Sequence, residues 1–273
     1  MLGLWVINLR HRRQFHSTPQ GHNNTYRSIR GGLVQHGLSA SIYRLAFWLR
    51  FGAVDRRGLL GITHPKMSLE RALDESDVLA EELLALVDLP LCDGSPRVDV
   101  AGVACSLAFE HWHAVRLLLR RYLLPSALVV HRSQFEAILR SVWLIHAATD
   151  SDIAKLTANL DFESEQSAKN ILQTQEMMEA LSKSGPENAY AALARFKDNS
   201  WKALNSYAHT GIHPLRRHAE GYPEALARGV LCNANGLAVM SGMQAAVLGG
   251  AQPLQRQVLD LAAKHPFCMP DPL

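Results

Sequence analysis

Residues 125–146 read PSALVVHRSQFEAILRSVWLIH, and this stretch decides the fold that the sequence predicts. Pro125 suits the first turn of a helix, and neither Gly nor Pro follows before His146. Apolar residues fall on every side of this helix, a pattern typical of a helix that is buried in a core. The sequence therefore predicts a central helix around which the other helices pack.

Three charged residues, Arg132, Glu136 and Arg140, follow one another along this helix at steps of four and share one face. Charges on a buried helix must be paired with other charges or must hold a ligand. The two arginines leave one surplus positive charge, which a facing acid, a water cluster or a phosphate would balance. We interpret this face either as a ligand or catalytic site or as a buried polar network that fixes helix register.

Composition places the chain among ordinary globular proteins. Of its 273 residues, 48% are apolar. The four cysteines lie far apart and form no CxxC pair, which indicates a reducing compartment and argues against a zinc ribbon or a disulfide framework. We therefore expect a cytoplasmic protein.

Charge divides the chain into two parts. Residues 1–66 contain ten Lys and Arg against one acid, whereas residues 67–273 contain 18 basic and 24 acidic residues. The body is thus mildly acidic and is not an obvious nucleic-acid-binding surface. The basic extension 1–66 has three interpretations: an arginine-rich targeting peptide, a basic arm, or sequence upstream of a native start at Met67. Ser68, a good helix N-cap, favours the third.

Turn residues divide the body, residues 67–273, into helical segments. The expected helices are 68–89, 100–124, the central helix from 125 to about 150, 152–184, 187–210, 223–249 and 253–264. The alternation that strands require is not found. The sequence predicts an all-α bundle of six or seven helices behind an irregular basic N-terminal extension.

Residues 229–255 carry no charge, and two interpretations compete for them. An uncharged apolar stretch of this length is long enough to span a membrane. Asn233 and Asn235, together with several Gly and Ala residues, instead favour a closely packed helix inside the bundle. We expect the interior helix and no membrane.

A second polar stripe lies in the segment WKALNSYAHTG at 201–211. Trp201, Asn205 and His209 are spaced by four, and His213 follows four residues later. Two helices that each bury such a stripe are expected to face one another. We therefore predict that Glu136, Asn205, Trp201 and His213 contact a ligand.

The segment SALVVHRSQFEAILRSVWL and the downstream W..LNSYAHTG resemble a bacterial family of uncharacterised all-helical proteins over roughly residues 67–250. They also resemble the HEPN superfamily of helical nucleases and nucleotide-binding modules, which is common in toxin and phage-defence systems. The motif of that superfamily is Arg, four to six residues, then His, often with Asn after the Arg. Asn205 and His209 match its Asn and His, whereas Leu204 stands in place of the Arg.

The HEPN resemblance implies a module that acts on RNA or a nucleotide, as a metal-independent endoribonuclease. His209 would then be the general acid/base at a ribose 2′-hydroxyl, and Arg132 or Arg140 would hold the phosphate. Arg140 and His146 also fit the spacing, but they lie about 120° apart on a helix. The alternative is a non-catalytic interaction or ligand-sensing domain. The expected partner is RNA or a nucleotide, and a homodimer is a further expectation.

Metal binding is the other chemical class that the histidines suggest. Glu110 and His113 have the i, i+3 spacing found in di-iron bundles, but such sites need a second pair, which the sequence lacks. His209 and His213 are separated by Gly211, which interrupts the helix that would align them. We expect neither a metal site nor a cofactor.

Overall fold

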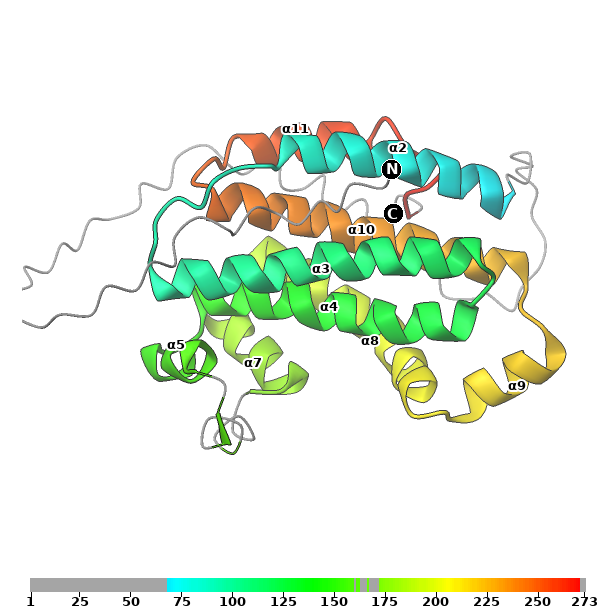
Figure 1. Cartoon of the computed structure of the whole chain (residues 1–273), viewed down its shortest axis with the longest axis horizontal. Coiled ribbons are helices and arrows are strands. Elements are labelled where there is room, and N and C mark those ends of the chain that lie inside the picture. The colour runs from blue at the N-terminus through cyan, green and yellow to red at the C-terminus, as the bar shows by residue number, and fades with distance from the viewer. Residues whose placement is uncertain (1–67, 160, 163–165, 167–171, 271–273) are drawn as a thin grey trace, which may run out of the picture.

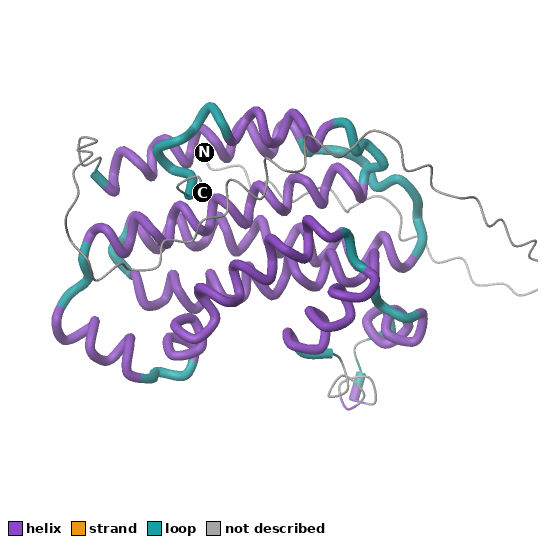
Figure 2. Tube along the Cα trace, turned by 180° about the vertical axis from the view of Figure 1, so that it is seen from behind, coloured by secondary structure: helices purple, strands orange, loops and turns teal. Residues whose placement is uncertain are grey.

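The computed structural model describes residues 68–159, 161–162, 166 and 172–270. Within these residues the chain forms no strand, which confirms the all-α prediction, and its helices with defined bounds number nine rather than six or seven (Figures 1 and 2). The helices are α2 (Leu69–Leu86), α3 (Pro96–Arg120), α4 (Leu124–His146), α5 (Asp150–Thr157), α7 (Thr174–Ser184), α8 (Glu187–Ala208), α9 (Ile212–Glu220), α10 (Glu224–Leu248) and α11 (Leu254–Ala262). The predicted basic extension, 1–66, lies outside the described residues.

Caps and prolines set the beginnings of the helices much as the sequence predicts. The Ser68 side chain accepts a hydrogen bond from the Arg71 N–H and begins α2. Ser95 caps α3 in the same way, and Pro96 occupies its first turn, so α3 begins four residues before the expected position 100. The turn between α3 and α4 contains Tyr122 at a φ of 58°, and the two helices pack as an antiparallel hairpin.

The central helix of the sequence prediction is α4, and it is the core of the bundle. Helices α3, α7, α8 and α10 all pack against it (Figure 1). Phe135, Ile138, Leu139 and Trp143 are fully buried along its length. Burying one such side chain contributes about 1.5–3 kcal/mol, so α4 supplies a large part of the hydrophobic stabilisation.

Most of the uncharged stretch, residues 229–248, belongs to α10, which packs against α2, α3, α4 and α11. In the described part of the chain, α10 is the one helix that is long and apolar enough to cross a membrane, and most of it is buried inside the bundle. Its Gly242 lies against Leu83 of α2 and Val258 of α11, where an added Cβ would come within 2.9 Å of a Leu83 methyl. These contacts agree with the interpretation of 229–255 as a closely packed interior helix.

The prediction of one helix over 152–184 is wrong. Helix α5 begins with a capping box between Thr149 and Asp152 and ends at Thr157, and α7 begins at Thr174. The Thr157 hydroxyl donates to the carbonyl of Ile153, and Ala158 is extended. Side-chain bonds of this kind compete with continuation of a helix, and Ile153 is the one buried residue of α5.

Helix α9 is absent from the sequence prediction because Pro214 was expected to end the preceding helix. Pro214 is instead the third residue of α9, where its missing N–H has no partner to lose within the helix. Gly211 begins α9, and Gly221, at a φ of 89°, ends it. Helix α9 projects from one end of the bundle and packs on α8 (Figure 1).

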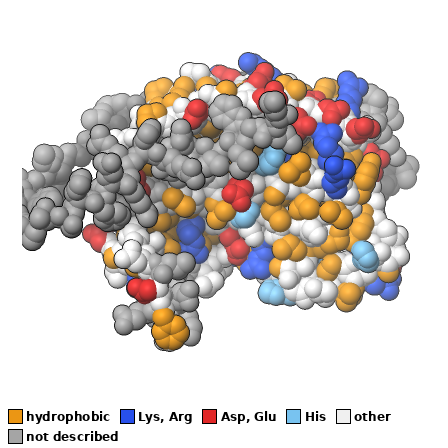
Figure 3. Space-filling model, viewed as in Figure 1, with side chains coloured by type: hydrophobic (Ala, Val, Ile, Leu, Met, Phe, Trp, Pro, Cys, Tyr) orange, Lys and Arg blue, Asp and Glu red, His pale blue; other side chains and the backbone are white. Residues whose placement is uncertain are grey.

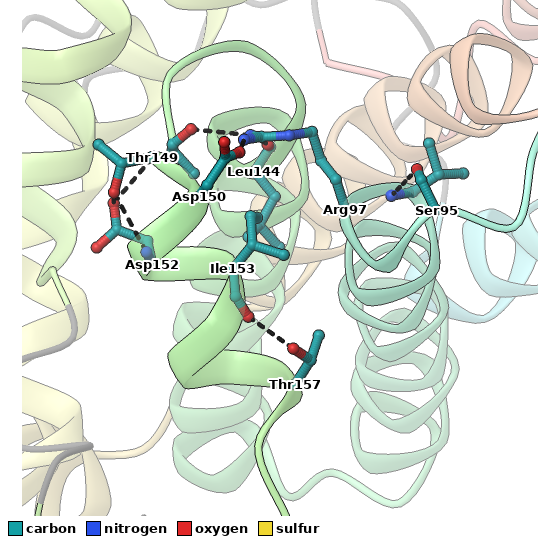
Figure 4. Close-up of polar contacts among 10 residues, drawn as sticks. Ser95, Arg97, Leu144, Thr149, Asp150, Asp152, Ile153 and Thr157 are labelled. Carbon is teal, nitrogen blue, oxygen red and sulfur yellow. Dashed lines mark hydrogen bonds and ion pairs between the residues drawn. The ribbon is translucent and has the colours of Figure 1, made fainter. Parts of the chain in front are cut away.

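Arg97 on α3 closes the C-terminal end of α4 (Figure 4). Its guanidinium donates to the carbonyl of Leu144 at 2.6 Å and to that of Ala148 at 2.8 Å, and it lies 2.8 Å from the Asp150 carboxylate. These carbonyls belong to the end of a helix, where they have no intrahelical donor. Arg97 therefore fixes the end of α4 and the start of α5 with one side chain.

Candidate ligand-binding site

The charged stripe of α4 lies at the rim of the core. Arg132 and Glu136 form an ion pair at 3.2 Å, and their side chains are 23% and 34% exposed. Arg140, one turn later, is also half-buried. The stripe is therefore open to solvent along one side, which corrects the expectation of a fully buried charged face.

Glu136 connects α4 with the beginning of α7. The Thr174 hydroxyl donates to Glu136 Oε1 at 3.2 Å, so this oxygen accepts from both Thr174 and Arg132. Thr174 is the first residue of α7, and the Gln173 N–H preceding it donates to the Glu176 carboxylate at 2.8 Å. The positive end of the α7 dipole thus lies beside the charged stripe.

Arg140 has fewer partners than its guanidinium can use. Its Nη2 donates to the Leu172 carbonyl over 3.4 Å, and its Nη1 is buried with no acceptor among the described residues. Burial lowers the pKa of Arg140, and the nearby Glu136 carboxylate acts in the opposite direction. A buried donor without an acceptor costs about 1–3 kcal/mol, which an anion at this position would recover.

Arg140 lies in a pocket of about 300 Å³ between α3, α4 and the first residues of α7. We call it the α4–α7 pocket, and its side chains include Leu107, His111, Ser133, Glu136, Arg140 and Thr174. Leu107, an exposed apolar side chain of α3, belongs to its border, and Figure 3 shows hydrophobic side chains gathered on the face of the bundle where α3 and α4 lie. The pocket combines one guanidinium, one imidazole and two hydroxyls with an apolar border and with the Glu136 carboxylate, which is paired with Arg132. The guanidinium and the imidazole suit a small anionic ligand.

Trp201 is the member of the second stripe that reaches the charged face of α4. The Arg132 guanidinium lies over its ring, 4.9 Å from the centroid, and Phe135 meets the same ring edge-on at 5.9 Å. The predicted facing of the two stripes is therefore found at this point. Trp201 and Glu136 both contact Arg132, whose Nε is nevertheless buried without an acceptor among the described residues, as Arg140 Nη1 is. Of the two guanidinium groups, that of Arg140 lies in the pocket.

His209 lies away from the pocket. Helix α8 ends at Ala208, and His209 is exposed in the turn that follows, where its N–H donates to the Asn205 carbonyl at 3.0 Å. It is eight residues beyond Trp201, or about 12 Å of helix rise. Figure 1 shows the end of α8 at the side of the bundle where α4 begins, whereas Arg140 belongs to the second half of α4. No contact among the described residues joins His209 to either arginine.

The remaining residues of the sequence prediction also lie outside the pocket. Asn205 is half-buried, and its Oδ1 has no donor among the described residues. His213 is exposed on α9, where its N–H donates to the Ser206 hydroxyl at 3.2 Å and its ring lies 6.3 Å from that of Tyr207. His146 is half-buried at the end of α4, and burial lowers its pKa. These residues do not line the α4–α7 pocket.

A second polar cluster, centred on Asn235 of α10, is fully sealed. Asn235 Oδ1 accepts from the Ser76 hydroxyl at 2.8 Å and from Trp112 Nε1 at 2.7 Å, and its Nδ2 donates to the Cys268 carbonyl at 2.7 Å. The residue is completely buried. We call this set the Asn235 cluster, and it has the properties of a network that fixes helix register.

Comparison with known proteins places the chain in a family. A family of unknown function, DUF6988, matches residues 105–271. The chain belongs to this family. The expected membership of an uncharacterised family is thereby confirmed. No curated protein and no solved structure is similar to the chain.

The DUF6988 segment begins within α3 and runs beyond α11. It contains every residue predicted for the site and all six side chains named for the α4–α7 pocket. Of these six, the sequence prediction missed four as ligand contacts: Leu107, His111, Ser133 and Thr174. The described residues contain no group of three or more His, Cys, Asp or Glu side chains that could hold a metal ion.

Proposed function

We propose that this DUF6988 protein is a ligand-sensing helical module that binds a phosphate-bearing ligand, a nucleotide or an RNA end, in the α4–α7 pocket. The observation that carries the proposal is the buried Arg140 Nη1, which has no acceptor in the described part of the chain and belongs to an open pocket. Guanidinium groups pair strongly with phosphate oxygens, and a helix N-terminus adds to the attraction. Ser133 provides a hydroxyl for a further phosphate oxygen, whereas the Thr174 hydroxyl donates to Glu136.

The resemblance to the HEPN superfamily supports an RNA or nucleotide ligand, and the proposed function does not include RNA cleavage. Binding needs Arg140, and it does not need an imidazole aligned with the phosphate. A cytoplasmic location and a role in toxin or phage-defence systems belong to the same proposal. None of the four cysteines forms a disulfide in the described part of the chain, which supports a reducing compartment.

Isothermal titration of the full chain with inorganic phosphate and with a 5′-phosphorylated RNA oligonucleotide tests the proposal. We expect saturable binding that Arg140→Ala weakens at least tenfold. Arg121→Ala, which removes an exposed arginine at the end of α3, is the matched control and should leave binding unchanged. Equal affinity in wild type and Arg140→Ala would contradict the proposal.

RNA cleavage by His209 is the second candidate function. One observation favours it: His209 is exposed beside α9, which carries Arg216, Arg217 and His218 and could attract an RNA backbone. In that arrangement the phosphate would be held at the end of α8 rather than by Arg132 or Arg140. Incubation with total RNA, comparing wild type with His209→Ala, tests this candidate.

A further inference from the structure

His111 brings a titratable group from α3 into the same pocket as Arg140 of α4. Its side chain is half-buried, and no hydrogen-bond partner for it is found among the described residues. Burial lowers the pKa of His111, and the adjacent Glu110 acts in the opposite direction. The imidazole is therefore largely neutral at pH 7, and it retains the capacity to take up a proton when a negative charge arrives.

The charged groups around His111 determine how its protonation would change the charge of the pocket. On α3 the neighbour is Glu110, which is exposed. On α4 the pocket contains Glu136 and Arg140, and the Glu136 carboxylate already accepts from Arg132 and Thr174. The N-terminus of α7 contributes the uncharged Gln173 and Thr174 and its positive dipole end. The Glu176 carboxylate in the first turn of α7 accepts a hydrogen bond from the Gln173 N–H. At neutral pH the pocket thus has one cation with unused donors, and protonation of His111 would add a second.

We propose that His111 is a second anion-binding group of the α4–α7 pocket, and that a phosphate-type anion binds together with a proton. This inference rests on the proposed function, because it concerns the same pocket. The anion favours the charged imidazole, and by linkage the charged imidazole favours the anion. Affinity for an anion of constant charge must then increase as the pH falls toward the range in which His111 titrates.

Sulfate is the appropriate probe because its charge stays constant across this range, whereas a phosphate monoester titrates near pH 6. The experiment is isothermal titration of the full chain with sulfate at pH 7.5, 6.5 and 5.5, at constant ionic strength. A bound anion that raises the pKa of His111 by one unit makes the protonated form bind about tenfold more tightly. We expect wild-type affinity to increase by several-fold, up to about tenfold, between pH 7.5 and 5.5.

Two variants of α3 provide the comparison. His111→Gln should remove most of the pH dependence of sulfate affinity. His113→Gln, two residues away and exposed, should retain the full pH dependence. Titrations in two buffers of different ionisation enthalpy should detect net proton uptake when sulfate binds to the wild-type protein. This measurement tests whether the anion binds together with a proton even if His111→Gln fails to fold.

The outcomes distinguish this inference from the proposed function. Sulfate binding that depends on Arg140 but has the same pH dependence in wild type and His111→Gln would overturn the role of His111 and leave the pocket as the ligand site. Binding without proton uptake would have the same consequence. If neither sulfate nor phosphate binds at any pH, the proposed function itself fails. Far-UV circular dichroism at pH 5.5 verifies that each protein is folded.

Discussion

Asn235 of α10 and Arg140 of α4 each carry polar atoms into the bundle, and their surroundings differ. Both polar atoms of the Asn235 side chain, Oδ1 and Nδ2, form hydrogen bonds of 2.7–2.8 Å with partners from α2, from α3 and from the segment after α11. Arg140 makes one hydrogen bond of 3.4 Å and has a buried nitrogen without an acceptor among the described residues. A satisfied network of the first kind specifies a fold, whereas unused donors beside a cavity are available to a ligand.

The comparison shows that a polar residue in a helical core indicates function only when its partners have been counted. By sequence alone, the Arg132, Glu136 and Arg140 set is the more conspicuous, because three charges on a core helix demand an explanation. Asn235 is a single amide in an uncharged helix, yet it ties three parts of the chain together. Substitutions at the two places should therefore differ in kind, with large losses of stability at Asn235 and changes in ligand affinity at the pocket.

The largest effect is expected for Asn235→Ala. The change leaves the Ser76 hydroxyl, the Trp112 Nε1–H and the Cys268 carbonyl without partners in a dry core, and each such group costs about 1–3 kcal/mol. We expect a loss of at least about 3 kcal/mol in the free energy of unfolding, measured by denaturant titration. Asn233→Ala, on the same helix and half-buried, is the control. A loss below about 1 kcal/mol would show that water replaces the amide and that the cluster is not sealed.

His131 should make stability depend on pH in the mildly acidic range. Its ring is buried, Nδ1 lies 3.0 Å from Gln134 Oε1, and Nε2 has no partner among the described residues. Burial lowers the pKa of His131 to about 4, with the Gln134 hydrogen bond acting in the opposite direction. Between pH 6.5 and 4 His131 is therefore protonated in the unfolded chain but not in the folded chain. As the pH decreases through this range, the free energy of unfolding decreases by up to about 3 kcal/mol.

Denaturant titrations at pH 7.5, 6 and 5 measure the His131 effect. His131→Leu loses the hydrogen bond to Gln134, so it should be less stable at pH 7.5, but its stability should decline less between pH 7.5 and 5. His113→Leu, which alters an exposed histidine, should retain the wild-type decline. An unchanged decline in His131→Leu would mean that other groups control acid stability.

The fold could be predicted from the sequence where signals within a helix, rather than its packing against other helices, set its bounds. Pro125, Ser68 and the apolar periodicity give the beginnings of α4 and α2 correctly, because these signals act within one turn. The failures also have local causes that compete with periodicity. Pro214 is compatible with a first turn as well as with a helix end, and the Thr157 hydroxyl bonds to a carbonyl of its own helix.

The site could be predicted only in part, because its geometry depends on how the helices pack. The Arg132–Glu136 pair follows from a spacing of four within α4, and the contact of Trp201 with Arg132 follows from two matching stripes. The positions of His111 and Thr174 depend on the register of α3 and α7 against α4, which no periodicity specifies. His209 continues the spacing of four in the second stripe, but α8 ends at Ala208, so His209 is no longer on the helix face that carries Trp201 and Asn205.

Glu136→Ala should reduce stability moderately, in contrast to the large loss expected for Asn235→Ala. The substitution removes the hydrogen bonds from Arg132 and Thr174, but the Glu136 side chain is 34% exposed and solvent can replace them. We expect a loss of about 1 kcal/mol in stability, and less for Glu136→Gln. Removing the negative charge beside Arg140 should also strengthen sulfate binding. A loss near 3 kcal/mol would instead place the charged stripe in a sealed core, like Asn235.

The smallest effect on stability is expected for His209→Ala, and it separates the two candidate functions. His209 is exposed after the last residue of α8, and the contact by which it ends the helix is made by its backbone N–H, which alanine retains. The free energy of unfolding should therefore change by less than about 0.5 kcal/mol. Sulfate binding in the α4–α7 pocket should be unaffected, because the ring lies about 12 Å of helix rise beyond Trp201. If His209→Ala abolishes cleavage of RNA that the wild-type protein degrades, the catalytic site lies at the end of α8. If the wild-type protein cleaves no RNA but binds phosphate through Arg140, the α4–α7 pocket is the functional site and His209 is a surface residue.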